Sequence, residues 1–183
     1  MTIAVYSGSF NPLHKGHEAI LRRLGRDYGK VLLVVTPQNP FKDPERADDA
    51  PQRVRAAREA LRRHPDINAQ VSDIELRMSP PQYTIRTLDA LREEMPGNDF
   101  TLVVGADCLE GFPRWKDYGR ILREYGIAVF PRKGYHRGHL RNRLLKEDPS
   151  YKIELLKAPL VTVSSTMIRE GLAQGKDMTK WLM

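Results

Sequence analysis

The segment from Gly8 to His17 combines a glycine and two histidines in a spacing that suits phosphate binding. Gly8 follows an apolar run, and a glycine there lets the backbone approach a phosphate closely. The helix expected after it offers free backbone N–H groups at its positive end. His14 and His17 stand three residues apart, so both imidazoles would lie near that end and face one anion. The segment therefore predicts a phosphate site; the alternative is a pair of surface or capping histidines beside a turn.

A second cluster of hydroxyl groups precedes the last expected helix. Ser164, Ser165 and Thr166 are natural N-terminal caps, and Arg169 follows one turn further on. Hydroxyl groups at a helix start and a nearby guanidinium can hold phosphate oxygens. The alternative is a plain helix cap with a surface arginine.

A third group of side chains could recognise the rest of a nucleotide. Asp107 follows an expected strand and Gly105, where a carboxylate could bind a ribose or a metal ion. Trp115 offers a flat face for stacking a ring, although a core tryptophan is the ordinary alternative.

Taken together, the first two motifs resemble those of the nucleotidyltransferases that carry a His-x-Gly-His motif, Rossmann-like enzymes that move AMP or CMP onto a phosphate. The first motif is Gly-Ser-Phe-Asn-Pro-Leu-His-Lys-Gly-His at 8–17, and the last is Val-Ser-Ser-Thr-Met-Ile-Arg at 163–169. Ser7 stands where many members have a second glycine. The resemblance implies that the histidines bind the triphosphate and that the last motif holds its β- and γ-phosphates. The implied ATP-binding residues are Gly8, Ser9, Phe10, His14, Gly16, His17, Gly105, Asp107, Ser165, Thr166 and Arg169.

Two further motifs resemble those of the nicotinate mononucleotide adenylyltransferases. They are Tyr-Thr-Ile-Arg-Thr-Leu at 83–88 and Gly-Ala-Asp at 105–107 followed by Trp115. The resemblance implies a pyridine mononucleotide site at Tyr83, Thr84, Trp115 and Lys116. Asn-Pro-Phe-Lys at 39–42 is similar to the family's Asn-Pro-His-Lys, so Lys42 could reach a phosphate.

The implied reaction transfers AMP from ATP to nicotinate mononucleotide and gives deamido-NAD and pyrophosphate, a step of NAD biosynthesis. The implied catalytic residues are His14, His17, Lys42 and Arg169, and Mg²⁺ is expected to arrive with ATP rather than on a metal site of the protein. Two alternatives remain open. The acceptor could be nicotinamide mononucleotide or phosphopantetheine, or the chain could be a basic nucleotide-binding or nucleic-acid-binding module without activity.

Expected strands and helices alternate along the chain between these motifs. The expected strands cover 3–6, 30–36, 69–74, 100–104, 127–130 and 152–156, and the expected helices cover 16–26, 52–63, 84–94, 118–124 and 165–173. Such alternation predicts an α/β protein with a Rossmann-like open parallel sheet and helices on both faces. We expect one nucleotidyltransferase domain over 1–183, with about 160–183 as a small C-terminal helical portion.

Composition limits the remaining choices. Cys108 is the only cysteine of 183 residues, so no intrachain disulfide is possible and a cytoplasmic location is expected. Hydrophobic residues make up 40% of the chain and no apolar run could span a bilayer, so no membrane partner is expected. The net charge of +7 suits a phosphate-rich ligand. The basic stretch 132–146 is interpreted as a solvated loop and helix face, so no nucleic acid is expected, while a homo-oligomer is left open.

Overall fold

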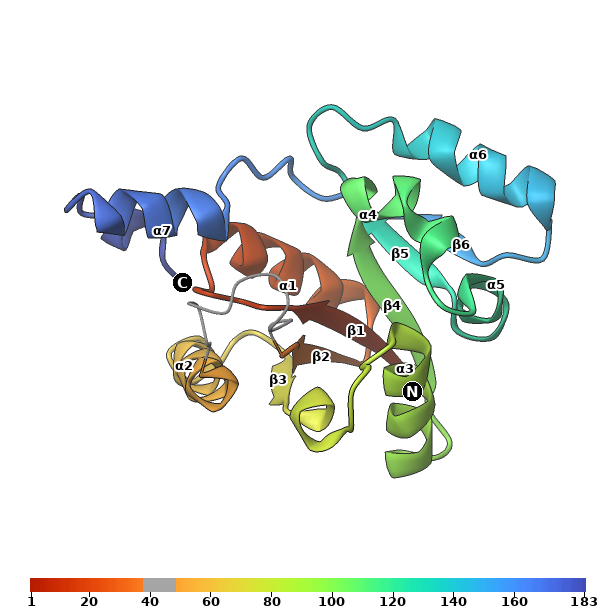
Figure 1. Ribbon diagram of the computed structural model, residues 1–183, viewed down its shortest axis with the longest axis horizontal. Coiled ribbons are helices and arrows are strands. Elements are labelled where there is room, and N and C mark those ends of the chain that lie inside the picture. Colours follow the sequence, from red (N-terminus) through yellow and green to blue (C-terminus); the bar gives the residue numbers. More distant parts are fainter. Residues whose placement is uncertain (38–48) are drawn as a thin grey trace.

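A six-stranded parallel sheet forms the centre of the molecule (Figure 1). The computed structural model describes residues 1–37 and 49–183, so Lys42 lies outside the described residues. Neighbouring strands follow the order β3-β2-β1-β4-β5-β6. This order confirms the expected open sheet and reverses between β1 and β4, where such folds bind ligands. The strands are β1 (Thr2–Gly8), β2 (Lys30–Val35), β3 (Ala69–Ser72), β4 (Asp99–Gly105), β5 (Ile127–Phe130) and β6 (Ile153–Leu155).

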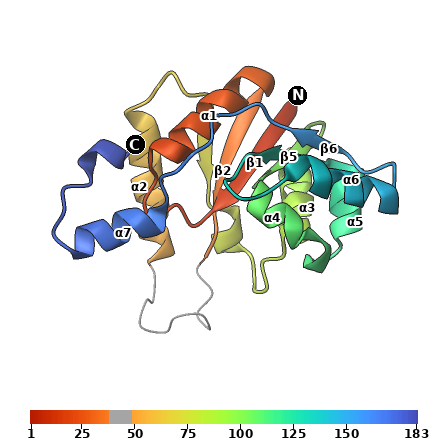
Figure 2. The same ribbon diagram turned by 90° about the horizontal axis from the view of Figure 1, so that it is seen from above.

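Helices cover both faces of the sheet, as Figure 2 shows from above. The alternation of side chains along β1 explains how one strand serves two cores. Ile3 and Val5 pack on the face covered by α3, whereas Ala4 and Tyr6 pack on the face covered by α1 and α2. The helices are α1 (Lys15–Asp27), α2 (Ala50–Arg62), α3 (Thr84–Glu94), α4 (Ala106–Glu110), α5 (Tyr118–Arg120), α6 (Arg137–Glu147) and α7 (Ser165–Ala173).

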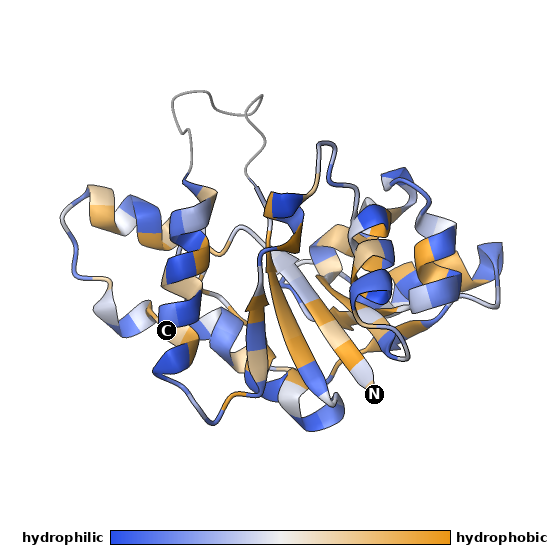
Figure 3. Ribbon diagram, turned by 90° about the horizontal axis from the view of Figure 1, so that it is seen from below, coloured by the Kyte–Doolittle hydropathy of each residue, from blue (hydrophilic) through white to orange (hydrophobic). Residues whose placement is uncertain are grey.

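The four central strands β1, β2, β4 and β5 are mostly buried, whereas the edge strands β3 and β6 are more exposed; the apolar colouring of strands in the sheet is visible in Figure 3. A connection from β6 runs back along α1 to α7, and Arg23 donates to the carbonyl of Lys157 at 2.7 Å. A third small cluster around Val163, Ile168 and Met178 seats α7. Among the described residues, the structure has no helix long and apolar enough to cross a membrane.

Helices α4 and α6 have no counterpart among the expected helix ranges, and two expected elements differ in form. The third strand ends at Ser72, and a 3₁₀ turn (η2, Ile74–Arg77) replaces its predicted end. Within this turn, the Glu75 carboxylate accepts a hydrogen bond from the Thr87 hydroxyl on α3. The expected helix at 118–124 begins as α5 and widens into a π-helical segment (η4, Ile121–Tyr125).

The contact between Glu75 and Thr87 is a buried polar pair that ties η2 to α3. The Thr87 hydroxyl donates to Glu75 Oε1 at 2.9 Å. Glu75 is 4% exposed and Thr87 is 1% exposed. Burial raises the pKa of Glu75 to about 7, and the hydrogen bond from Thr87 opposes the shift in part. The ionised carboxylate is therefore destabilising at this position.

We expect Glu75→Gln to stabilise the protein at pH 8. The folded-state pKa lies above the unfolded value, so this group costs stability as pH rises from about 4.5 to 7. Glutamine keeps an acceptor for Thr87 without the charge, so urea unfolding should show a gain of about 3 kcal/mol at pH 8 and almost none at pH 4.5. Exposed Glu93→Gln is the control and should change little at either pH. A less stable Glu75→Gln at pH 8 would contradict the assignment.

Candidate active site

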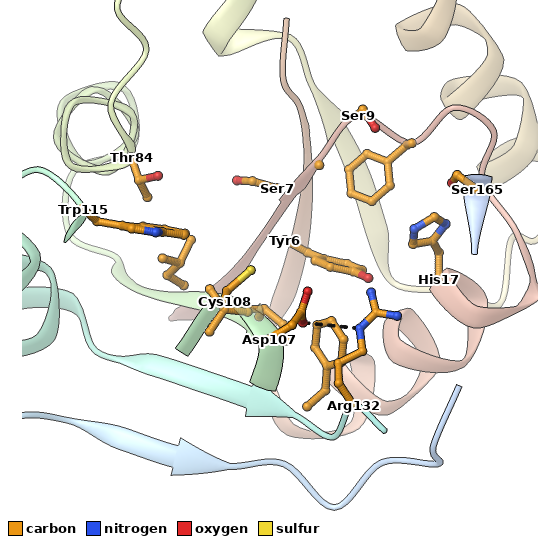
Figure 4. A pocket seen from close by; sticks show the side chains of 17 residues that line it. Tyr6, Ser7, Ser9, His17, Thr84, Asp107, Cys108, Trp115, Arg132 and Ser165 are labelled. Carbon is orange, nitrogen blue, oxygen red and sulfur yellow. Dashed lines mark ion pairs between the residues drawn. The ribbon is translucent and has the colours of Figure 1, made fainter. Parts of the chain in front are cut away.

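A pocket of about 230 Å³ opens at the carboxyl ends of β1 and β4, where the strand order reverses (Figure 4). It collects side chains that are far apart in the sequence, from Tyr6 to Ser165. Of the predicted site residues, the structure brings nine to its lining: Gly8, Ser9, Phe10, His17, Thr84, Gly105, Asp107, Trp115 and Ser165.

His14 and His17 are both capping residues and near neighbours of the pocket. His14 is the N-cap of α1, and its Nδ1 accepts from the backbone N–H groups of Gly16 and His17 at 3.1 and 3.3 Å. In return, Nδ1 of His17 accepts from the N–H of His14 at 3.2 Å. The rings stack with centroids 3.6 Å apart. The capping and phosphate-binding interpretations of this pair are therefore compatible.

This arrangement corrects one expectation. The backbone N–H groups of His14, Gly16 and His17 are not free for a phosphate, because the two imidazoles already accept them. Since both Nδ1 atoms are acceptors, each neutral ring carries its proton on Nε2. At the start of α1, the imidazole N–H of His17 therefore faces the pocket in place of these three backbone N–H groups.

Both histidines are neutral at pH 7, because their pKa values are lowered. Burial, reinforced by the positive charge of Arg132, lowers the pKa of His14 to about 4. Burial also holds the pKa of His17 well below its ordinary value, with further lowering from His14 and Arg132. Only His17 lines the pocket; His14 is 5% exposed and supports His17 from behind. Gly16 leaves room for this stack, because a Cβ there would lie 2.8 Å from the His14 ring and 2.3 Å from Val161.

The turn between β1 and α1 is held in an unusual conformation. Phe10 has φ 49°, which few residues other than glycine adopt, and its ring lies 3.1 Å from where a Cβ on Gly8 would be. Buried Arg53 on α2 donates to the carbonyl oxygens of Ser9 and Thr36 at 2.6 and 3.0 Å. Arg53 thereby ties together the chain segments that leave β1 and β2.

The start of α7 docks on the same turn. The Ser165 hydroxyl donates to the carbonyl of Pro12 at 3.0 Å, and Arg169 donates to that of Asn11 at 2.6 Å. Ser164 caps the helix by accepting from the N–H of Met167 at 3.1 Å. The first and last motifs therefore meet, although only Ser165 of the last motif reaches the pocket lining. Thr166 and Arg169 lie outside it, 3.2 Å from each other.

Arg132 is a site residue that the sequence interpretation missed. It follows β5, lines the pocket, and forms a 3.5 Å ion pair with Asp107 Oδ1 (Figure 4). Its guanidinium lies 5.3 Å from the centre of the Phe130 ring. The interpretation of 132–146 as solvated is wrong here and at Arg137, which donates to the carbonyl of Val129 at 2.7 Å and also to that of Leu156. The missed signal was the position of Arg132 two residues beyond a buried strand.

The opposite side of the pocket carries Thr84 and Trp115. Thr84 is the first residue of α3, and Trp115 packs against Phe112 with ring centroids 4.6 Å apart. Of the other residues predicted to bind the mononucleotide, Tyr83 is 45% exposed and Lys116 is exposed, and neither lines the pocket. Half-buried Cys108 also lines the pocket, and burial raises the pKa of its thiol.

The parallel sheet, its switch-point pocket and the histidine pair at the first helix together define a nucleotidyltransferase. Residues 5–171 match the family model described as cytidylyltransferase-like, and the chain belongs to that family. Within it, the chain is a member of the nicotinate-nucleotide adenylyltransferases, as two similar sequences show. The probable nicotinate-nucleotide adenylyltransferase of Flavobacterium psychrophilum is 36% identical, with 97% of this chain and 90% of that protein covered. Its counterpart from Bacteroides fragilis is 37% identical, with 97% and 85% covered.

Solved structures share the fold. Plasmodium falciparum nicotinic acid mononucleotide adenylyltransferase, complexed with NaAD, matches with a TM-score of 0.78 at 18% identity over 99% of this chain and 90% of that one. A putative nicotinate-nucleotide adenylyltransferase from Vibrio parahaemolyticus matches with a TM-score of 0.70 at 21% identity over 100% and 86%. These matches confirm the expected α/β nucleotidyltransferase fold.

Proposed function

We propose that the pocket transfers AMP from ATP to nicotinate mononucleotide, giving deamido-NAD and pyrophosphate. The observation that carries the proposal is the division of the pocket into two halves. His17, Arg132 and the turn after Gly8 offer phosphate-binding groups on one side, and Thr84 and Trp115 offer a ring-binding surface on the other. ATP and a mononucleotide can thus meet with their phosphates at the centre.

The reaction needs positioning and charge neutralisation. The 5′-phosphate of the mononucleotide attacks the α-phosphorus of ATP in line, and the bond to the β-phosphate breaks as pyrophosphate leaves. Nε2–H of His17 donates to a phosphate oxygen, and Arg132 exchanges its ion pair with Asp107 for a phosphate. The attacking group is already an anion, so no general base is required. Arg169 and Ser165 hold the turn against α7, which fixes the place of the triphosphate.

The donor set suits magnesium that is carried mainly by the nucleotide. Asp107 is the carboxylate in the pocket lining, and the described residues contain no group of three or more His, Cys, Asp and Glu side chains able to hold a metal ion. Mg²⁺ commonly binds one or two carboxylates together with substrate phosphates and water. When bound, the ion would neutralise phosphate charge, with Asp107 as its protein ligand. A cytoplasmic location belongs to the same proposal, because a chain with one cysteine suits a reducing compartment.

A pyrophosphate-release assay tests the function. The purified protein with ATP and Mg²⁺ is given nicotinate mononucleotide, nicotinamide mononucleotide or phosphopantetheine in parallel. We expect release with nicotinate mononucleotide above the other two. If no acceptor gave pyrophosphate, the proposed enzymatic activity would be refuted. If only phosphopantetheine gave pyrophosphate, the acceptor would not be a pyridine mononucleotide.

A further inference from the structure

Ser7 lies at the end of β1, where its neighbour Gly8 begins the turn of the phosphate site. Ser7 brings a hydroxyl group to the pocket lining. A polar group at the centre of a site can contact the ligand.

The strand alternation determines which half of the pocket receives this hydroxyl. Tyr6 points to the face that holds Phe10 and His17, so Ser7 points to the other face, with Ile3 and Val5. Figure 4 shows the Ser7 side chain directed toward the space beside Thr84 and Trp115 and away from His17. Ser7 thus belongs to the ring-binding half of the site.

Three polar groups in this half have no hydrogen-bond partner within the described parts of the chain. They are the Ser7 hydroxyl, the Thr84 hydroxyl and the Trp115 indole N–H. Each residue lines the pocket, so a ligand can reach it. A hydroxyl group both donates and accepts, which makes it a suitable partner for the hydroxyl groups of a sugar.

A mononucleotide is a linear arrangement of ring, sugar and 5′-phosphate, and the pocket has the same order. Trp115 and Thr84 lie at the ring end, and Gly8 and His17 lie at the phosphate end. Ser7 immediately precedes Gly8 and is directed toward Thr84, so it lies between the two ends. We propose that the Ser7 hydroxyl binds the ribose of the acceptor mononucleotide, an inference that rests on the proposed function.

Binding measurements on Ser7→Ala test this assignment without requiring turnover. Calorimetry would compare nicotinate mononucleotide, ribose 5-phosphate and ATP on wild type and variant. We expect the affinities for the mononucleotide and for ribose 5-phosphate to fall roughly 3-fold to 10-fold, as for the loss of one neutral hydrogen bond. The affinity for ATP should stay within twofold. Ser150→Ala, at an exposed serine outside the pocket, is the matched control and should leave all three unchanged.

Three results would overturn the inference. They are unchanged binding of the mononucleotide, an equal loss for ATP, and a loss for the mononucleotide that ribose 5-phosphate does not share. The last result would place Ser7 against the ring rather than the sugar. The pyrophosphate-release assay on wild type decides the proposed function separately, so that the two failures remain distinguishable.

Discussion

The kcat of the His17→Ala variant is expected to fall by a factor of at least about 10²–10³, while the variant still binds ATP. His17 lines the pocket, and its ring is the neutral Nε2–H donor that faces the triphosphate in the proposed reaction. Alanine removes this donor from a site whose catalysis depends on correctly placed hydrogen-bond donors. Steady-state pyrophosphate release with Mg²⁺ and nicotinate mononucleotide measures kcat, and calorimetry measures ATP binding.

Loss of the cap must be separated from loss of the donor. His17 also accepts the N–H of His14 at 3.2 Å, so alanine should destabilise α1 by about 1 kcal/mol. His17→Gln should restore that cap, because glutamine at the third helical position can accept the same N–H, yet it should remain at least tenfold slow. His139→Ala, on the exposed face of α6, is the control for a change of histidine. Turnover of His17→Ala within tenfold of wild type, with ATP still bound, would remove His17 from the mechanism.

The second large effect is expected at Arg132. Arg132→Ala should lower kcat/KM by about 10²-fold or more, because it removes a guanidinium that lines the pocket and binds a substrate phosphate in the proposed reaction. Arg132→Lys should recover part of the loss, since lysine keeps the charge but not the planar fork. The measurement is kcat/KM for each substrate in the pyrophosphate-release assay.

The electrostatic role of Arg132 has a readout of its own. Its charge contributes to the low pKa of both His14 and His17, so NMR titration should show both values rising in Arg132→Ala. The Arg132→Lys variant should show a smaller rise. Exposed Lys133→Ala is the matched control and should change neither kcat/KM nor the histidine titrations by more than a small factor. An Arg132→Ala enzyme with wild-type kcat/KM would leave Arg132 as a support for Asp107 only.

Local pattern was enough to predict most of the fold and part of the site. Unalternated apolar runs predicted the parallel strands, because a strand covered on both faces must be apolar on both. The predicted helix over residues 16–26 became α1 with one extra residue at each end. The end of the third strand and the π-helical segment at Ile121–Tyr125 were not predicted, and the turn that ends the strand makes a contact with α3 that lies outside the local pattern.

The strand, turn and helix that place His14 and His17 follow from local sequence, because their spacing and the glycine before them act over short distances. The other side chains of the phosphate half come together through contacts between distant parts of the chain. Arg132 enters because β5 lies beside β4 and the carboxyl ends of parallel strands share one edge. The sheet edge, and not the local sequence, decides which basic residue of the stretch 132–146 faces the pocket. The sequence pattern predicted helix N–H groups that are free to bind a phosphate. In the structure, the two histidine rings accept three of these N–H groups.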